Sequence, residues 1–244
     1  MKIDAKGMHY KELNEKIREL IGIEVNAIEL ENVNGQRYIG AGIGKDIKIA
    51  INGVPGNALG IFMDGPTITV NANAQDGVGN TMNSGKIVVH GFSGDIVGYS
   101  MRGGKIFVRN NVGYRVGIHM KEYKEQKPVI IIGGVAMDYL GEYMAGGVLI
   151  VLGLGKEKNQ PIAGNYIGTG MHSGVMYIRG KIENHQVGKG VGIIEPNGDD
   201  KNQLRKYLEE YCKDFGLDIE EILMGNFIKL APLTHRPYGN LYSH

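Results

Sequence analysis

The stretch Asp95–Val108, "DIVGYSMRGGKIFV", contains a pattern that recurs along the chain. In each copy an aliphatic residue precedes a glycine, and a methionine stands three positions after that glycine. Successive copies begin about 20 residues apart, a period typical of solenoid proteins. The six complete copies contain Gly60 and Met63, Gly79 and Met82, Gly98 and Met101, Gly117 and Met120, Gly141 and Met144, and Gly168 and Met171. Weaker copies begin at Gly40 and Gly188, with Ile43 and Val191 at the methionine position.

Each copy ends in a short β-branched and apolar run, such as "KIFV" at 105–108 or "VIII" at 129–132, which is typical of a strand. The repeat is too short to hold a strand and a helix. At ~3.3 Å per residue it traces roughly 60 Å, which is one turn of a narrow coil. The sequence therefore predicts a mainly β protein, a single-stranded parallel β-helix of about seven to eight coils. Right-handed winding is the default for parallel crossovers.

The repeated residues are expected to be structural. The methionines should stack inside the coil, where a flexible side chain fills a narrow interior. The glycines should lie at a corner that needs tight or left-handed backbone. Asn or Asp usually stands three residues before the glycine, and its side chain can bond a neighbouring backbone group there.

The segments that flank the repeat predict helical caps. Residues 9–21 and 199–215 both have apolar residues at helical spacing, with Asp199 or Asp200 as the second N-cap and Gly216 as its stop. Cys212 is expected to be a buried small hydrophobe. The chain thus divides into an N-terminal helical cap (1–35), a repeat domain (36–198), and a C-terminal helix with an extended tail (199–244), together one structural domain.

Three further segments depart from the regular repeat. The copies around 123–127 and 154–161 carry insertions, which a solenoid displays as protruding loops. Such loops serve either as a binding face or as plain solvated connections. The tail from Phe227, which contains Pro232, Pro237 and Gly239, is expected to be extended and to lie on its own surface or on a partner's.

Composition excludes several function classes. The formal net charge is +1, which favours neither nucleic acid nor an anionic membrane as a partner. No apolar run is long enough to span a bilayer and the first residues lack an apolar signal core, so a cytoplasmic protein is expected. Cys212 is the single cysteine, which excludes an internal disulfide, an ordinary iron–sulfur cluster and a Cys-based zinc site.

No candidate active site emerges from the motifs. Glu157 follows Gly155 and Lys156 where a phosphate-binding loop needs Ser or Thr, and "GTGMHSG" at 168–174 has the wrong spacing for a dinucleotide site. The carboxylate pairs Asp199/Asp200 and Glu220/Glu221 lie in charged segments that we expect to be solvated. No histidine pair has the HExxH spacing of a metal site. Surface or interface positions are expected for His9, His90, His119, His172, His185, His235 and His244, with a metal-ligand role as the lesser alternative. We therefore expect no catalytic, cofactor-binding or metal-binding residue in this chain.

The motifs also resemble a known family. "GDIVGYSMRGGKIFV" and "GEYMAGGVLIVLG" are similar to the Gly-x-Gly-x-Gly repeat domain at the C-terminus of the glutamate synthase large subunit. The resemblance covers roughly residues 39–195, and the chain looks like a stand-alone subunit of the archaeal type. It implies a right-handed β-helix that packs against the amidotransferase and FMN synthase components and carries no catalytic residue of its own.

The resemblance also sets the expected partners and cofactors. Glutamate synthase makes two glutamates from glutamine and 2-oxoglutarate, with FMN and an iron–sulfur cluster on partner subunits. The chain is thus expected to be a structural subunit without activity alone, with other glutamate synthase subunits or a second copy of itself as partners. One of the subunits of formylmethanofuran dehydrogenase has similar coils, which the stretch 76–113 resembles, so a scaffold role in such a redox complex is an alternative. An independent β-helix enzyme is a further one.

Overall fold

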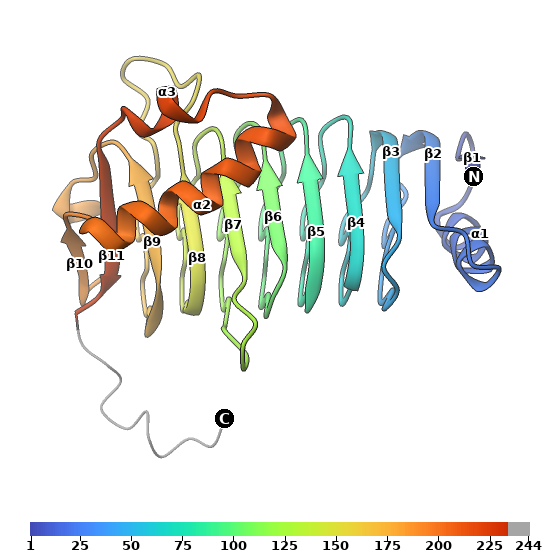
Figure 1. Cartoon of the computed structure of the whole chain (residues 1–244), viewed down its shortest axis with the longest axis horizontal. Coiled ribbons are helices and arrows are strands. Elements are labelled where there is room, and N and C mark those ends of the chain that lie inside the picture. Colours follow the sequence, from blue (N-terminus) through green and yellow to red (C-terminus); the bar gives the residue numbers. More distant parts are fainter. Residues whose placement is uncertain (234–244) are drawn as a thin grey trace.

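A computed structural model describes residues 1–233, which form one sheet wound into a rod (Figure 1). The elements in chain order are β1 (Lys2–Asp4), α1 (Tyr10–Gly22), β2 (Ala27–Asn34), β3 (Lys48–Val54), β4 (Asp64–Val70), β5 (Ser84–Val89), β6 (Lys105–Val108), β7 (Val129–Ile132), β8 (Ala145–Val151), β9 (Ser173–Arg179), the 3-10 helix η1 (Asn184–Gln186), β10 (Val191–Ile194), α2 (Gly198–Phe215), α3 (Ile219–Leu223) and β11 (Phe227–Pro232).

Strands β1 to β9 pair in parallel, each with the next strand along the chain. Identical repeat positions are in register, so Ile87 pairs with Ile106, and Ile106 pairs with Ile130. This arrangement confirms the predicted parallel β-solenoid. The regular part has about six turns, those with the complete motif, so the predicted seven to eight is slightly too high. The copy at Gly188 leads to β10, which pairs with β11 instead of β9.

The interior is built from the repeated residues. Met63, Met82, Met101, Met120 and Met144 are fully buried and Met171 nearly so, which confirms their predicted inward direction. At all six repeat glycines φ lies between 66° and 71°, the left-handed region. Asp76 and Asp95 accept bonds from the backbone N–H groups of Asp95 and Tyr114, one turn further on, at 2.9 and 2.8 Å. Side chain and backbone thus tie each turn to the next.

The N-terminal end is covered by α1, which begins after the N-cap His9 and lies beside β1 and β2 (Figure 1). Leu13 and Ile17 of α1 are buried against the solenoid core. The segment 1–35 therefore holds a helical cap together with two strands of the sheet.

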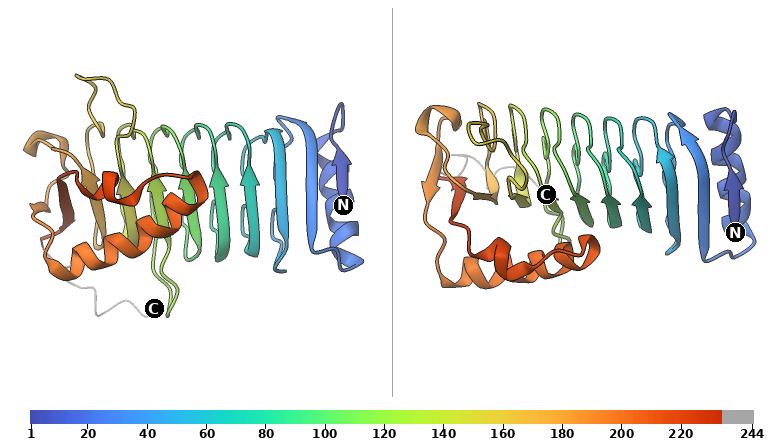
Figure 2. Two further views of the ribbon diagram at one scale, coloured as in Figure 1. Left: turned by 45° about the horizontal axis from the view of Figure 1, so that its top comes forward. Right: turned by 90° about the horizontal axis from the view of Figure 1, so that it is seen from above.

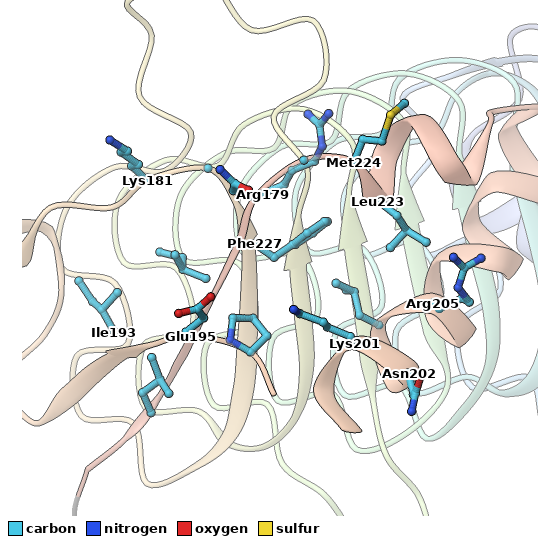
Figure 3. Close-up of a pocket in the computed structure, with 17 residues that line it drawn as sticks. Arg179, Lys181, Ile193, Glu195, Lys201, Asn202, Arg205, Leu223, Met224 and Phe227 are labelled. Atoms are coloured by element: carbon cyan, nitrogen blue, oxygen red, sulfur yellow. The ribbon is translucent and has the colours of Figure 1, made fainter. Parts of the chain in front are cut away.

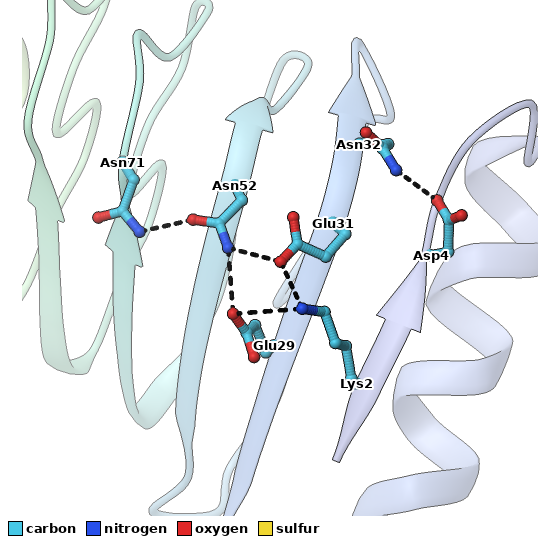
Figure 4. A network of polar contacts seen from close by, with 7 residues as sticks. All are labelled: Lys2, Asp4, Glu29, Glu31, Asn32, Asn52 and Asn71. Carbon is cyan, nitrogen blue, oxygen red and sulfur yellow. Dashed lines mark hydrogen bonds and ion pairs between the residues drawn. The ribbon is translucent and has the colours of Figure 1, made fainter.

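The outer face of the first strands is polar and uncovered. Asn52 donates to Glu29 and Glu31 at 3.2 and 3.1 Å, and Asn71 donates to Asn52 at 2.7 Å (Figure 4). Lys2 pairs with Glu31 at 2.8 Å. This network links β1, β2 and β3, and Asn71 directly after β4, by side chains in addition to the backbone ladder.

The outer face of β5 to β9 is apolar, and α2 lies across it (Figure 2). Leu204, Leu208, Tyr211, Cys212 and Phe215 of α2 are buried, as their spacing predicts. They form a second apolar cluster with outward strand residues, namely Val88, Phe107, Val129, Ile131, Val148, Ile150 and Tyr177. Burial also raises the pKa of the Cys212 thiol, which disfavours the reactive thiolate and agrees with a packed side chain.

The predicted start of α2 is wrong, whereas its predicted end is correct. The N-cap is Asn197, so the predicted Asp199 or Asp200 is wrong; Asp200 instead completes a capping box with Asn197. The helix ends before Gly216, which has φ 64°, as predicted.

The C-terminal segment enters the sheet itself. Strand β11 is extended, as expected, but it lies between β9 and β10 and pairs antiparallel with both. The expected surface position is therefore wrong for residues 227–232, because their backbone groups complete the sheet ladder. Pro237 and Gly239 lie outside the described residues. The two insertions protrude as loops (Figure 1). Among the described residues, no helix is long and apolar enough to cross a bilayer.

Candidate functional site

Within the part of the chain that the structure describes, the histidines and carboxylate pairs weighed in the sequence do not gather into one site. Within residues 1–233 no group of three or more His, Cys, Asp or Glu side chains is arranged to hold a metal ion. His9 caps α1, and His90 packs against Phe215 with ring centroids 5.1 Å apart. His119 is exposed, His172 half-buried and His185 exposed in η1, whereas His235 and His244 lie outside the described part of the chain.

The carboxylate pairs have structural contacts. Asp200 is buried, so its expected solvation is wrong; it accepts bonds from the Tyr177 hydroxyl and the Lys229 ammonium, both at 2.7 Å. Glu220 is paired with Arg205 through both carboxylate oxygens, at 2.6 and 3.2 Å. These groups hold α2 and α3 in place.

The exposed turns of the solenoid have an unusual backbone. In each turn, the residue two before the repeat glycine and the residue two after it have positive φ. The first set is Tyr38, Ala58, Gly77, Ile96, Arg115, Tyr139 and Tyr166, and the second is Gly42, Phe62, Thr81, Ser100, His119, Tyr143 and Gly170. In every turn before that of Gly168 their N–H groups bond the next turn, as that of His119 does with the Glu142 carbonyl at 3.0 Å. These hydrogen bonds therefore hold in place the backbone that carries the large side chains at the corners.

Aromatic side chains occupy these corners in three consecutive turns, those of Gly117, Gly141 and Gly168, and Tyr99 lies beside the corner of the turn before them. The Arg115 guanidinium lies 4.5 Å from the centroid of the Tyr139 ring, and that ring stacks on Tyr166 at 4.8 Å. At the other corner His119 stacks on Tyr143 at 5.2 Å, and Tyr99 meets His119 edge-on at 5.9 Å. We call Tyr99, Arg115, His119, Tyr139, Tyr143 and Tyr166 the aromatic patch.

A buried carboxylate lies beneath the aromatic patch. Glu142, between Tyr139 and Tyr143 in the chain, has a side chain only 8% exposed, and its carboxylate accepts a hydrogen bond from Arg115. The corresponding positions of the two preceding turns carry Tyr99 and Ile118. A buried charge needs a partner. The Glu142 carboxylate therefore holds the guanidinium of Arg115 against the Tyr139 ring.

The patch has the chemistry of a binding surface. Tyr99, Tyr143 and Tyr166 are 36%, 45% and 53% exposed, although tyrosine favours partly buried sites. Tyrosine and arginine are enriched at the centres of protein–protein interfaces. The exposed rings and the guanidinium of Arg115 suit the arrangement to recognition.

Sequence reasoning identified one residue of the aromatic patch as exposed. His119 was expected at a surface, and it is there. The stacks were missed because Tyr139, Tyr143 and Tyr166 are variable positions within the repeat. Aligning the copies and reading the second residue on either side of each glycine would have placed these rings in two columns.

Comparison with known proteins finds a relative that is similar in sequence and a solved structure that is similar in fold. The chain is 52% identical over 249 residues to an uncharacterized protein of Methanocaldococcus jannaschii, and the match covers 99% of this chain and 95% of that protein. A chain of the formyltransferase/hydrolase complex of Methylorubrum extorquens, solved in complex with methylofuran, has a similar fold. Its TM-score is 0.66 at 17% identity, over 93% of this chain and 89% of that one.

The family defined by the GXGXG motif matches residues 14–234, nearly the whole length of the chain. The match spans the six repeat turns together with most of α1 and all of α2 and β11. On this evidence the chain belongs to the GXGXG motif family.

Proposed function

We propose that this chain is a non-catalytic scaffold subunit of a multi-subunit enzyme, and specifically of a glutamate synthase. In that role it packs against the amidotransferase and FMN synthase components. The aromatic patch is the observation that carries the proposal, because it gives a rigid rod an exposed surface of the residue types that dominate protein–protein binding.

The patch is also pre-organised for binding. Tyr139 and Tyr143 donate their backbone N–H groups to Asn165 and Thr169 of the next turn at 2.9 and 2.8 Å, so the corners are held before a partner arrives. Neighbouring rings restrict one another's rotation. A surface that is already ordered loses little conformational entropy on association, which favours affinity.

The enzyme assignment comes from the motif resemblance to the glutamate synthase repeat domain. Under this proposal FMN and the iron–sulfur cluster reside on partner subunits, and the chain has no turnover alone. The complex acts in the cytoplasm. A second copy of the chain is an alternative occupant of the aromatic patch.

A second candidate is a scaffold role in a complex related to formylmethanofuran dehydrogenase. The observation that favours it is the shape similarity to a chain of the formyltransferase/hydrolase complex, which extends over 93% of this chain. Both candidates share the coarser role of a subunit that assembles with catalytic chains.

Co-purification distinguishes the candidates. A tagged copy is expressed in the native host, purified at moderate salt, and its stoichiometric partners are identified by mass spectrometry. The proposal expects amidotransferase and FMN-binding synthase chains. Recovery of formylmethanofuran-related chains would favour the second candidate, and glutamine-dependent glutamate formation by the isolated chain would contradict a scaffold role.

A further inference from the structure

A groove of about 1030 Å³ lies at the C-terminal end of the rod, and no residue of the aromatic patch lines it (Figure 3). Residues of α2 and α3 form one side, and the ends of β9, β10 and β11 form the other. Phe227, Leu204 and Leu223 of the outer apolar cluster give it an apolar floor, and Ile194 continues the apolar lining toward the end of the sheet. The groove is thus an open channel between the last strands and the helix that crosses them.

Positive charge dominates the rim. Arg179, Lys181, Lys201 and Arg205 line the groove, and Glu195 is the one acidic residue of the lining. Arg205 is neutralised by Glu220, but the Lys181 and Lys201 side chains are exposed and make no ion pair or hydrogen bond with the described residues. Arg179 uses its Nε to bond the Ile222 carbonyl at 2.9 Å and carries its charge at the groove. Because the whole chain has a net charge of only +1, this excess is local.

Exposed apolar side chains accompany this charge. Met224 is 79% exposed and Ile194 is 41% exposed, and both line the groove. A flexible methionine adapts to varied apolar partners. The combination of an apolar floor with a basic rim complements a chain segment that alternates aliphatic and acidic side chains.

We propose that this groove binds an acidic, aliphatic-rich segment of a partner protein. A small dianion would use the charges and leave the apolar floor and Met224 exposed to water. Residues 234–244 of the chain contain no Asp or Glu, so they lack the side chains that would neutralise the rim. The site is separate from the aromatic patch, and its existence does not depend on which enzyme the chain belongs to.

The test uses defined probes and needs no native partner. Fluorescein-labelled peptides of four Glu-Leu, four Gln-Leu or four Lys-Leu repeats are titrated with the full chain, and binding is followed by fluorescence anisotropy. The groove variant is Lys181→Glu/Lys201→Glu. The matched control is Lys11→Glu/Lys158→Glu, which makes the same charge change at exposed lysines without side-chain partners in the described part of the chain. Circular dichroism checks that both variants keep the fold.

The Glu-Leu peptide is expected to bind wild type and the control alike and to bind the groove variant at least about tenfold more weakly. Its affinity should fall as salt rises, because the rim charges are exposed. Equal binding of the Gln-Leu or Lys-Leu peptide, equal losses in both variants, or no binding of the Glu-Leu peptide to wild type would overturn the proposal. Displacement of the peptide by stoichiometric citrate would also overturn it, since the groove would then be a small-anion site.

Discussion

At the residue scale, the glycine of the repeat corner meets two separate demands. Gly98 has φ 68°, which a side chain rarely adopts, and a Cβ atom there would lie 2.3 Å from Cδ1 of Ile130 on β7. Other glycines have an ordinary φ and are needed only because a Cβ atom would have no room. A Cβ at Gly113 would lie 1.9 Å from the carboxylate of Asp95, which bonds the backbone of that turn. Much of the high glycine content therefore makes room for adjacent turns.

A matched pair of variants separates backbone strain from packing. Gly155 has φ 69°, close to that of Gly98, but nothing lies within 4 Å of its Cβ position. Gly98→Ala and Gly155→Ala should both lose about 1–2 kcal/mol from left-handed strain. Gly98→Ala should lose roughly 1–3 kcal/mol more, because its methyl group overpacks the interior. Urea unfolding measures both, and equal losses would show that the corner glycine is needed for its backbone alone.

The sequence predicted some of these residue-level features and missed others. Recurrence at one register identified the buried methionines and the left-handed glycines, because every turn repeats the same constraint. The aromatic patch was not predicted, since Arg115 and Tyr139 form one column only when turns of different length are superposed. Asp200 was misjudged for another reason: its partners Tyr177 and Lys229 come from strands distant in sequence.

At the scale of elements, α2 is anchored to the sheet by ionised groups near both ends. Asp200 bonds Tyr177 and Lys229 near the start of α2, and Glu210 pairs with Lys86 at 3.0 Å and with Lys105 near its end. Burial alone would raise the pKa of Asp200, but hydrogen bonds from Lys229 and Tyr177 outweigh it and hold that pKa below its ordinary value. The pKa of Glu210 is likewise lowered, because bonds from Lys105 and Lys86 outweigh its burial.

These lowered pKa values predict a loss of stability in acid. In the unfolded chain such carboxyls titrate near pH 4, and in the folded chain they titrate lower, so their contribution is complete above about pH 4 and is lost as pH falls through the folded pKa. Asp200→Asn should cost about 2 kcal/mol at pH 7. The difference from wild type should shrink below about pH 4. Thermal unfolding from pH 7 to pH 3 measures this.

Asp199→Asn is the control, since Asp199 is an exposed neighbour in the same first turn. It should change stability little. A constant gap between wild type and Asp200→Asn down to the lowest pH would contradict an ionised anchor at Asp200.

The sequence specified α2 as a helix and identified its buried face, because its apolar spacing is strong. Its position was not predictable, although the strands carried a hint. "VIII" at 129–132 is apolar on both faces, whereas "ITV" at 68–70 alternates with threonine. Strand β7 is buried on both sides because α2 covers its outer face, and β4 is not covered.

At the scale of the whole molecule, the rod is a stack of turns closed by two different caps. Helix α1 covers one end, and antiparallel β11 with β10 replaces the next turn at the other. An uncovered end would offer unpaired edges and apolar side chains to another copy. The sequence predicted a helical N-terminal cap, but β11 was not foreseen because its single copy has no repeat signature.

Opening the N-terminal cap should therefore cause self-association. Leu13 and Ile17 are 0% and 1% exposed, so Leu13→Asp/Ile17→Asp should detach α1 and expose the end of the core. Sedimentation velocity is expected to show higher oligomers that grow with concentration. Glu15→Lys, an exposed change on the same helix, is the control and should sediment like wild type. A monomeric double variant of unchanged stability would mean that α1 does not seal the rod.

The central claim, that this chain is a scaffold that docks through its aromatic patch, is tested most directly by the affinity for its co-purified partner subunits. Tyr139→Ala/Tyr143→Ser removes two rings but copies Ala58 and Ser100, which hold the same left-handed positions in other turns. Phe62→Ser is the control, because Phe62 is an exposed ring at the same kind of corner but outside the patch. The account predicts that the double variant binds about 100-fold more weakly while the control binds as wild type. Unchanged affinity of the double variant would contradict it.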